Sequence, residues 1–92
     1  MMITETRRQF EVTPDQGLHL RLASRFAHLA SHFESEVTVS SGGQPANAKS
    51  VLDLLTLAAS RGDLLDVEAR GADAEAAVEA LWELAASWGS DA

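Results

Sequence analysis

The stretch Gly17-Leu18-His19-Leu20-Arg21-Leu22-Ala23 marks the change from a turn to a helix, and the patterns on both sides of it set the order of the elements. Before it, residues 14–17 read Pro-Asp-Gln-Gly, a cluster of turn-forming residues. This cluster ends a predicted strand at residues 8–13, where apolar and polar side chains alternate. After it, apolar residues recur every three or four positions over residues 22–33, which predicts a helix that begins directly after His19.

The rest of the chain continues the mixture of strands and helices. Residues 36–40 alternate and are β-branched, and a Ser-Gly-Gly-Gln turn leads from them into a weak edge strand at 45–48 that contains a proline. The later predicted elements are a leucine-rich helix at 50–59, a strand with one polar face at 64–69 and a long helix at 72–88. The order βαββαβα predicts an α+β fold, an open-faced sandwich in which an antiparallel four-stranded sheet is covered on one face by three helices.

Composition limits the classes of function. The 92 residues suffice for one domain with a modest core, and we expect a single domain over residues 1–92 with its core at about 8–88. The absence of cysteine excludes disulfides and thiolate metal sites and fits a reducing cytoplasm. The net charge of −7 argues against nucleic-acid binding, and no apolar stretch approaches the roughly 20 residues of a membrane span. A module that works at its surface fits these limits better than an enzyme with an enclosed site.

The charges are unevenly distributed along the chain. The last third is acidic, whereas four basic side chains are expected near His19, namely Arg21, Arg25, His28 and Lys49. The three-and-four spacing of a helix aligns Ser24 with the first three of them along one side. A basic surface on an acidic protein suits the binding of anions and of an acidic partner.

His19 is the candidate for chemistry. A helix start presents unpaired N–H groups and a partial positive charge, which makes it a natural cradle for a phosphate. Histidine is nucleophilic near neutral pH, and Arg21 is placed to donate a charge-assisted hydrogen bond to phosphoryl oxygens. Gly17 allows the turn to bend and a partner to approach closely. From residue type and position alone, a plain surface or capping role for His19 is the commoner outcome.

The same stretch resembles the phosphorylation-site motif of the histidine-containing phosphocarrier protein family, HPr, of the sugar phosphotransferase system. That motif runs Gly-Leu/Met-His-x-Arg-Pro-Ala. The segment Ala48-Lys49-Ser50-Val51-Leu52-Asp53-Leu54-Leu55 is similar to the family's second signature, and βαββαβα is the family's element order. The second half of the chain looks as much like the nitrogen-related branch as the sugar branch. The resemblance implies an HPr-like fold and a phosphoryl carrier that needs no cofactor and is not itself an enzyme.

The resemblance also implies roles for individual residues. His19 would accept a phosphoryl group from enzyme I, which phosphoenolpyruvate charges, and pass it to an enzyme IIA acceptor, with Arg21 as the phosphate partner. The docking surface would comprise Leu20, Ser24, Val51, Leu52 and Leu55, extended by the basic side chains of Arg25 and His28. Leu22 departs from the pattern, since the family has a proline there. Proline suits the first turn of a helix, and leucine starts the helix less rigidly but adds an amide donor.

Ser50 has two interpretations. It is a predicted helix N-cap, with Asp53 three positions later as in a capping box. The family's regulatory branch phosphorylates the matching serine, so HPr kinase and a transcription regulator are further candidate partners. Asp53 would repel a phosphate on Ser50.

The remaining histidines and the role of the whole domain also allow more than one interpretation. His28 and His32 lie four apart, a spacing that can hold zinc, but without an evident third ligand a solvated helix face is favoured and no metal is expected. The chain can instead be a regulatory binding module of the same fold, whose phosphorylation state signals rather than feeds transport. It can also be a plain interaction domain in which His19 is never phosphorylated. Its small size favours a monomer.

Overall fold

The structure of this protein is a computed structural model that describes residues 4–88. Its seven elements follow the predicted order βαββαβα. They are β1 (Thr4–Glu11), α1 (Leu20–Ala30), β2 (Glu36–Ser41), β3 (Gln44–Asn47), α2 (Val51–Thr56), β4 (Leu64–Gly71) and α3 (Ala74–Ala86). Within residues 4–88, no helix is long and apolar enough to cross a bilayer.

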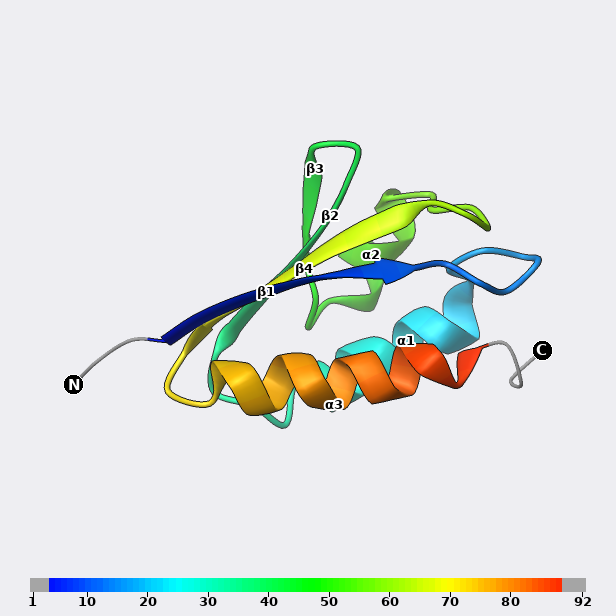
Figure 1. Cartoon of the computed structure of the whole chain (residues 1–92). Helices are drawn as coiled ribbons and strands as arrows, with labels where there is room; N and C mark the ends of the chain where they lie inside the picture. The colour runs from blue at the N-terminus through cyan, green and yellow to red at the C-terminus, as the bar shows by residue number, and fades with distance from the viewer. Residues whose placement is uncertain (1–3, 89–92) are drawn as a thin grey trace.

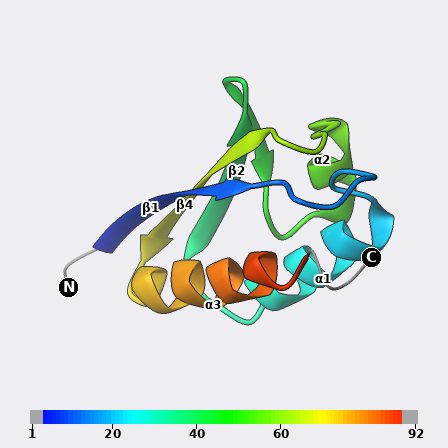
Figure 2. The same cartoon turned by 45° about the vertical axis from the view of Figure 1, so that its right-hand side comes forward.

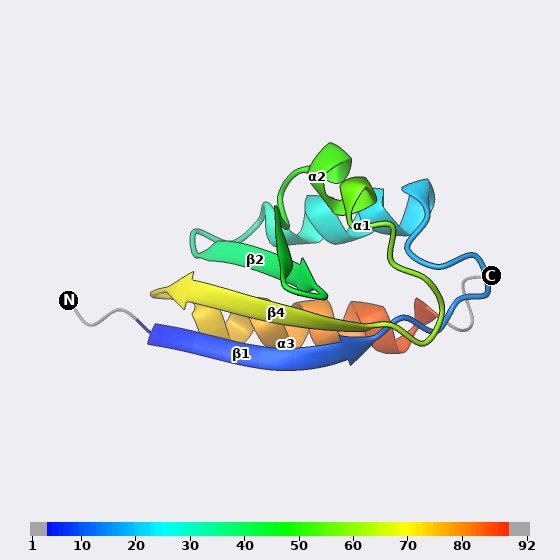
Figure 3. The same cartoon turned by 90° about the horizontal axis from the view of Figure 1, so that it is seen from above.

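The four strands form one antiparallel sheet in the order β1-β4-β2-β3, with helices on one face. Figure 1 shows α1 and α3 below the sheet and the β2–β3 hairpin rising from it. Seen from above, β4 lies between β1 and β2, and α3 runs under β1 and β4 (Figure 3). The two faces of β4 differ as the sequence predicted, because Leu65, Val67 and Ala69 are buried while Asp66 and Arg70 are exposed.

Aromatic rings join the sheet to the helices in the core. Phe10 of β1 is fully buried and packs edge-on against Phe26 of α1 at 6.3 Å and against Trp82 of α3 at 5.4 Å between ring centroids. Phe26 in turn contacts Trp88, with 6.1 Å between the centroids. Burial of each large apolar side chain contributes about 2–3 kcal/mol. These contacts fix α1, and hence its first residue, relative to the sheet.

Several element boundaries differ from the sequence prediction. Strand β1 begins four residues earlier than expected, because its whole length pairs with β4 from Thr4 opposite Gly71 to Glu11 opposite Leu64. Helix α1 has Leu20 as its first residue, and it ends at Ala30, three residues before the end of the predicted helical pattern. His19 is therefore directly adjacent to the helix, as predicted.

Candidate functional site

His19 is the N-cap residue of α1. Its backbone is extended (φ −80°, ψ 175°), and its carbonyl accepts a hydrogen bond from the N–H of Ala23 at 2.9 Å, the first bond of the helix. Among the residues that the structure describes, its imidazole makes no capping hydrogen bond to the helix. The side chain is half-buried. The backbone of His19 thus starts the helix while its ring is not used for that purpose.

The first turn of α1 supplies backbone donors beside His19. Leu20, Arg21 and Leu22 occupy the first three helical positions, where N–H groups have no partner within the helix. The side chain of Leu22 is only 1% exposed and belongs to the core. Leucine in place of the family's proline therefore adds core contact and an N–H donor, and the helix forms with it.

A cavity of about 280 Å³ opens in front of His19 and is lined by Pro14, Asp15, Gln16, His19 and Arg21. The structure thus brings together His19 and Arg21, as the sequence predicted. The sequence interpretation missed Asp15 and Gln16, which it treated only as turn residues. Their polar side chains, placed just before Gly17, were the signal that could have identified them as part of the site.

The loop before His19 is held by the chain that follows α2. Gly17 has a φ of +72°, and its N–H donates to the carbonyl of Pro14 at 2.9 Å. The N–H of Leu18 donates to the carbonyl of Ala59 at 3.0 Å. A Cβ atom on Gly17 would lie 2.3 Å from that same carbonyl oxygen. The close contact between the two backbones therefore requires glycine here.

The expected docking residues lie on α1 and α2, which pack against each other. Leu20 is 62% and Leu52 is 76% exposed, whereas Val51 and Leu55 are half-buried against the core. Figure 2 shows α2 above the first turns of α1. The remaining docking residues lie along α1, where Ser24 is half-buried and Arg25 and His28 are exposed. The short helix α2 therefore leaves apolar surface exposed at Leu52.

Lys49 does not belong to this surface, and the expectation that it lies near His19 is wrong. Its ammonium donates to the carbonyl of Phe33 at 2.7 Å, beyond the C-terminal end of α1. Since α1 has 11 residues, this end lies about 16 Å from its start. The sequence pattern does not reveal that the long side chain of Lys49 binds this backbone carbonyl.

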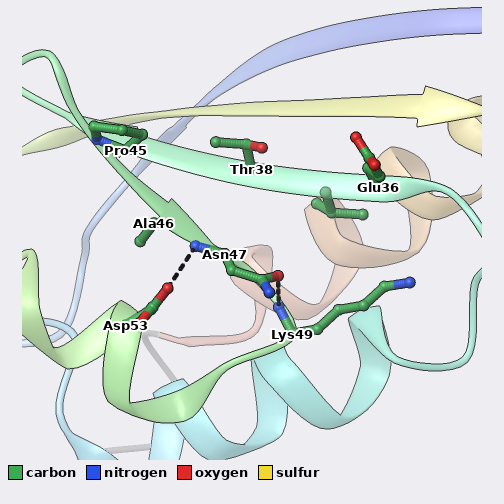
Figure 4. A pocket seen from close by; sticks show the side chains of 8 residues that line it. Glu36, Thr38, Pro45, Ala46, Asn47, Lys49 and Asp53 are labelled. Carbon is green, nitrogen blue, oxygen red and sulfur yellow. Dashed lines mark hydrogen bonds between the residues drawn. The ribbon is translucent and has the colours of Figure 1, made fainter.

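Ser50 is the N-cap of α2, as predicted. Its Oγ accepts a hydrogen bond from the N–H of Asp53 at 3.2 Å, and the Asp53 carboxylate accepts one from the N–H of Asn47 at 3.3 Å. Figure 4 shows Asp53 and Asn47 in a cavity of about 460 Å³ between α2 and the hairpin strands β2 and β3. None of the residues that line this cavity is shared with the cavity of His19.

His28, in the last turn of α1, contacts His32, which lies just beyond the end of the helix, so the prediction that both lie on one helix is wrong. Their ring centroids are 5.0 Å apart, and Nδ1 of His32 hydrogen-bonds with the carbonyl of His28 at 2.9 Å. Within residues 4–88, no three histidine or acidic side chains come together as a metal site. Both side chains are exposed, but only His28 belongs to the helix.

Known proteins are similar to this chain in sequence and in fold. Residues 6–87 match the family described as "PTS HPr component phosphorylation site". Phosphocarrier protein HPr of Haemophilus influenzae is 46% identical over 71 residues, which cover 77% of this chain and 84% of that protein. Phosphocarrier protein NPr of Shewanella violacea is 39% identical over 82 residues, 89% of this chain and 90% of the relative. The crystal structure of HPr-C-His from Thermoanaerobacter tengcongensis superposes with a TM-score of 0.87 at 33% identity, covering 92% of this chain and 96% of that one.

Proposed function

This chain belongs to the HPr family of phosphocarrier proteins of the phosphotransferase system, and we propose that His19 is the residue that carries the phosphoryl group. Members of this family are carriers and not catalytic enzymes. The observation that supports His19 is its position at the start of α1, in a cavity that it shares with Arg21. No other residue combines a nucleophilic ring with a helix start in the part of the chain that the structure describes.

The proposed step is an in-line transfer between two proteins. A ring nitrogen of His19 attacks the phosphorus, the bond between phosphorus and the donor breaks, and the donor leaves with the electron pair. The ring proton of His19 passes to the donor or to water. The N–H groups of the first turn and the guanidinium of Arg21 stabilise the phosphoryl oxygens. Transfer to the acceptor is the reverse of these events with a new partner.

The proposed partners are enzyme I as donor and an enzyme IIA domain as acceptor. Leu20 and Leu52 support docking, because exposed apolar side chains beside a reactive group are typical of a contact surface. Arg25 and His28 extend this surface with basic groups that suit an acidic partner. We place this exchange in the cytoplasm, with the carrier acting as a monomer that presents one face to each partner in turn.

Phosphotransfer to the isolated protein tests the proposal. The protein is mixed with phosphoenolpyruvate and the host's enzyme I, and its intact mass and the acid stability of any added group are measured. We expect one acid-labile phosphoryl group that is absent in His19→Ala. No phosphate on the wild-type protein, or the same phosphate on the variant, excludes His19 as the acceptor.

Regulation through Ser50 is a separate prediction. A regulatory branch of the family would phosphorylate this serine, but here its Oγ already accepts a hydrogen bond from the N–H of Asp53, a residue that adds a negative charge to the same helix turn. Treatment with an HPr kinase followed by intact-mass analysis tests the prediction, and no mass shift at Ser50 ends it.

If phosphate on His19 is retained when enzyme IIA domains are added, a signalling module replaces the transit carrier as the function of this chain.

A further inference from the structure

We propose that Arg61, acting through Asp15, sets how firmly His19 holds its phosphoryl group. The inference rests on the proposed function of His19 and adds no covalent step to it. Arg61 is a positioning residue here, because it acts on the site by neutralising a carboxylate in the wall of the cavity. Neither Asp15 nor Arg61 belongs to the motif around His19.

The geometry places one member of the pair directly at the site. Asp15 lines the cavity together with His19 and Arg21. Its Oδ1 lies 2.7 Å from Nη1 of Arg61, which stands 46 residues further along the chain. The contact joins the turn before His19 to the connection between α2 and β4.

Backbone contacts hold the two segments in register. The N–H of Val12 donates to the carbonyl of Asp63 at 2.9 Å, and the N–H of Gly62 donates to the carbonyl of Val12 at 2.8 Å. The Asp63 carboxylate accepts from the N–H of Ser60 at 2.9 Å. The ion pair is exposed, with 67% of the Arg61 and 85% of the Asp15 side chain accessible, but its two backbones are fixed next to each other.

Charge gives the pair its effect on the site. A phosphoryl group on a side chain carries about −1.5 to −2 charges at neutral pH, so an uncompensated carboxylate in the same cavity disfavours it. A sphere with the volume of the cavity, about 280 Å³, is about 8 Å across, which is within the Debye length of about 10 Å at 0.1 M salt. Asp15 therefore acts on the phosphoryl group at low salt, and Arg61 offsets this repulsion.

The phosphotransfer equilibrium tests the inference, because an equilibrium constant does not depend on how well the protein docks to its donor. Phosphoenolpyruvate and excess pyruvate are equilibrated with the protein and catalytic enzyme I, and the phosphorylated fraction is measured by intact mass. Arg61→Gln is expected to lower the equilibrium constant for phosphorylation about threefold at low salt, and Asp15→Asn to raise it by a similar factor. Arg61→Lys restores the wild-type value, and the double variant lies close to it. Both effects shrink as salt is added.

Arg7 and Glu68 provide a matched control, since they form an exposed ion pair with the same 2.7 Å distance on the open face of the sheet. Arg7→Gln and Glu68→Gln change the net charge equally and are expected to leave the equilibrium unchanged. Wild-type values for Arg61→Gln and Asp15→Asn overturn the inference while the function of His19 stands. Equal shifts in the control variants also overturn it, because the effect is then one of net charge. A wild-type protein that takes no phosphate overturns the inference and the proposed function together.

Discussion

Gly17 is a position in the site where any other amino acid would strain the backbone. At its φ of +72°, any residue with a Cβ pays about 1–2 kcal/mol, and here that Cβ would also lie 2.3 Å from the Ala59 carbonyl oxygen. We predict that Gly17→Ala lowers the free energy of unfolding by more than about 2 kcal/mol and slows phosphorylation, since the bond from Leu18 to Ala59 must shift. Urea denaturation and the rate of phosphate uptake measure the two effects.

A substitution at Gly43 is the control that separates the cost of backbone strain from the cost of a steric clash. Its φ is +84°, but a Cβ there meets nothing within 4 Å. Gly43→Ala is therefore expected to cost only the backbone penalty of about 1–2 kcal/mol and to leave phosphorylation unchanged. If both variants lose the same stability and take phosphate at the same rate, the contact with Ala59 has no role.

The candidate site could be predicted from sequence only where its residues are neighbours in the chain. His19 and Arg21 were found because two positions on one helix start suffice to define them. Arg61 was missed because its partner Asp15 lies 46 residues away, and no local pattern encodes that contact. Lys49 was misplaced for a related reason, since the carbonyl of Phe33 that binds it is exposed only once α1 has ended.

At the level of elements, the N-cap of α2 is a local device that sequence does encode. Helix α2 has only six residues, Val51–Thr56, so each of its terminal hydrogen bonds matters. We predict that Ser50→Ala lowers the free energy of unfolding by about 1 kcal/mol, whereas Ser50→Asp retains the cap and changes the stability little. Urea denaturation measures both.

Ser31 is the control for this prediction. Its Oγ donates to the carbonyl of Ala27 at 2.8 Å at the end of α1, where the backbone N–H of Ser31 binds the same oxygen. Because that acceptor keeps a partner, Ser31→Ala should cost less than about 0.5 kcal/mol. A loss for Ser50→Ala no larger than this would show that the cap contributes little to α2.

The strands show where the periodicity signal fails. In β4 the buried Leu65, Val67 and Ala69 alternate with polar residues, and the predicted strand was close to the observed one. The first half of β1 has no such pattern, because Thr6 and Arg8 occupy the helix-facing positions. Arg8 lies over the ring of Trp82, 3.7 Å from its centroid, and so covers the core with a charged side chain. Pairing with β4, which the local sequence does not announce, makes these residues a strand.

At the scale of the whole molecule, Asp73 ties together two connections that lie far apart in sequence. Its carboxylate accepts hydrogen bonds from the N–H groups of Glu34 and Ser35, each at 2.9 Å, and from the Ser35 hydroxyl. It thereby fastens the chain between α1 and β2 to the start of α3. The fit is tight, since a Cβ on Gly71 would lie 2.8 Å from the Cα of Ser35. This closure is a tertiary feature, and the sequence interpretation did not contain it.

The hydrogen bonds from Ser35 and Glu34 lower the pKa of Asp73 below its ordinary value, and this makes part of the stability pH-dependent. A carboxyl whose pKa is lower in the folded state stabilises the protein above its unfolded pKa of about 3.9, and that contribution is lost as the pH falls through the folded value. We therefore predict that Asp73→Asn is less stable than the wild type at pH 7 and that the difference narrows below about pH 4. Urea denaturation from pH 7 to pH 2 measures it. Glu79→Gln on the exposed side of α3 removes the same charge, and we expect it to leave the pH dependence of the free energy of unfolding below pH 4 unchanged. A difference between Asp73→Asn and the wild type that stays constant down to pH 2 would mean that the ionised carboxylate is not what closes the two connections.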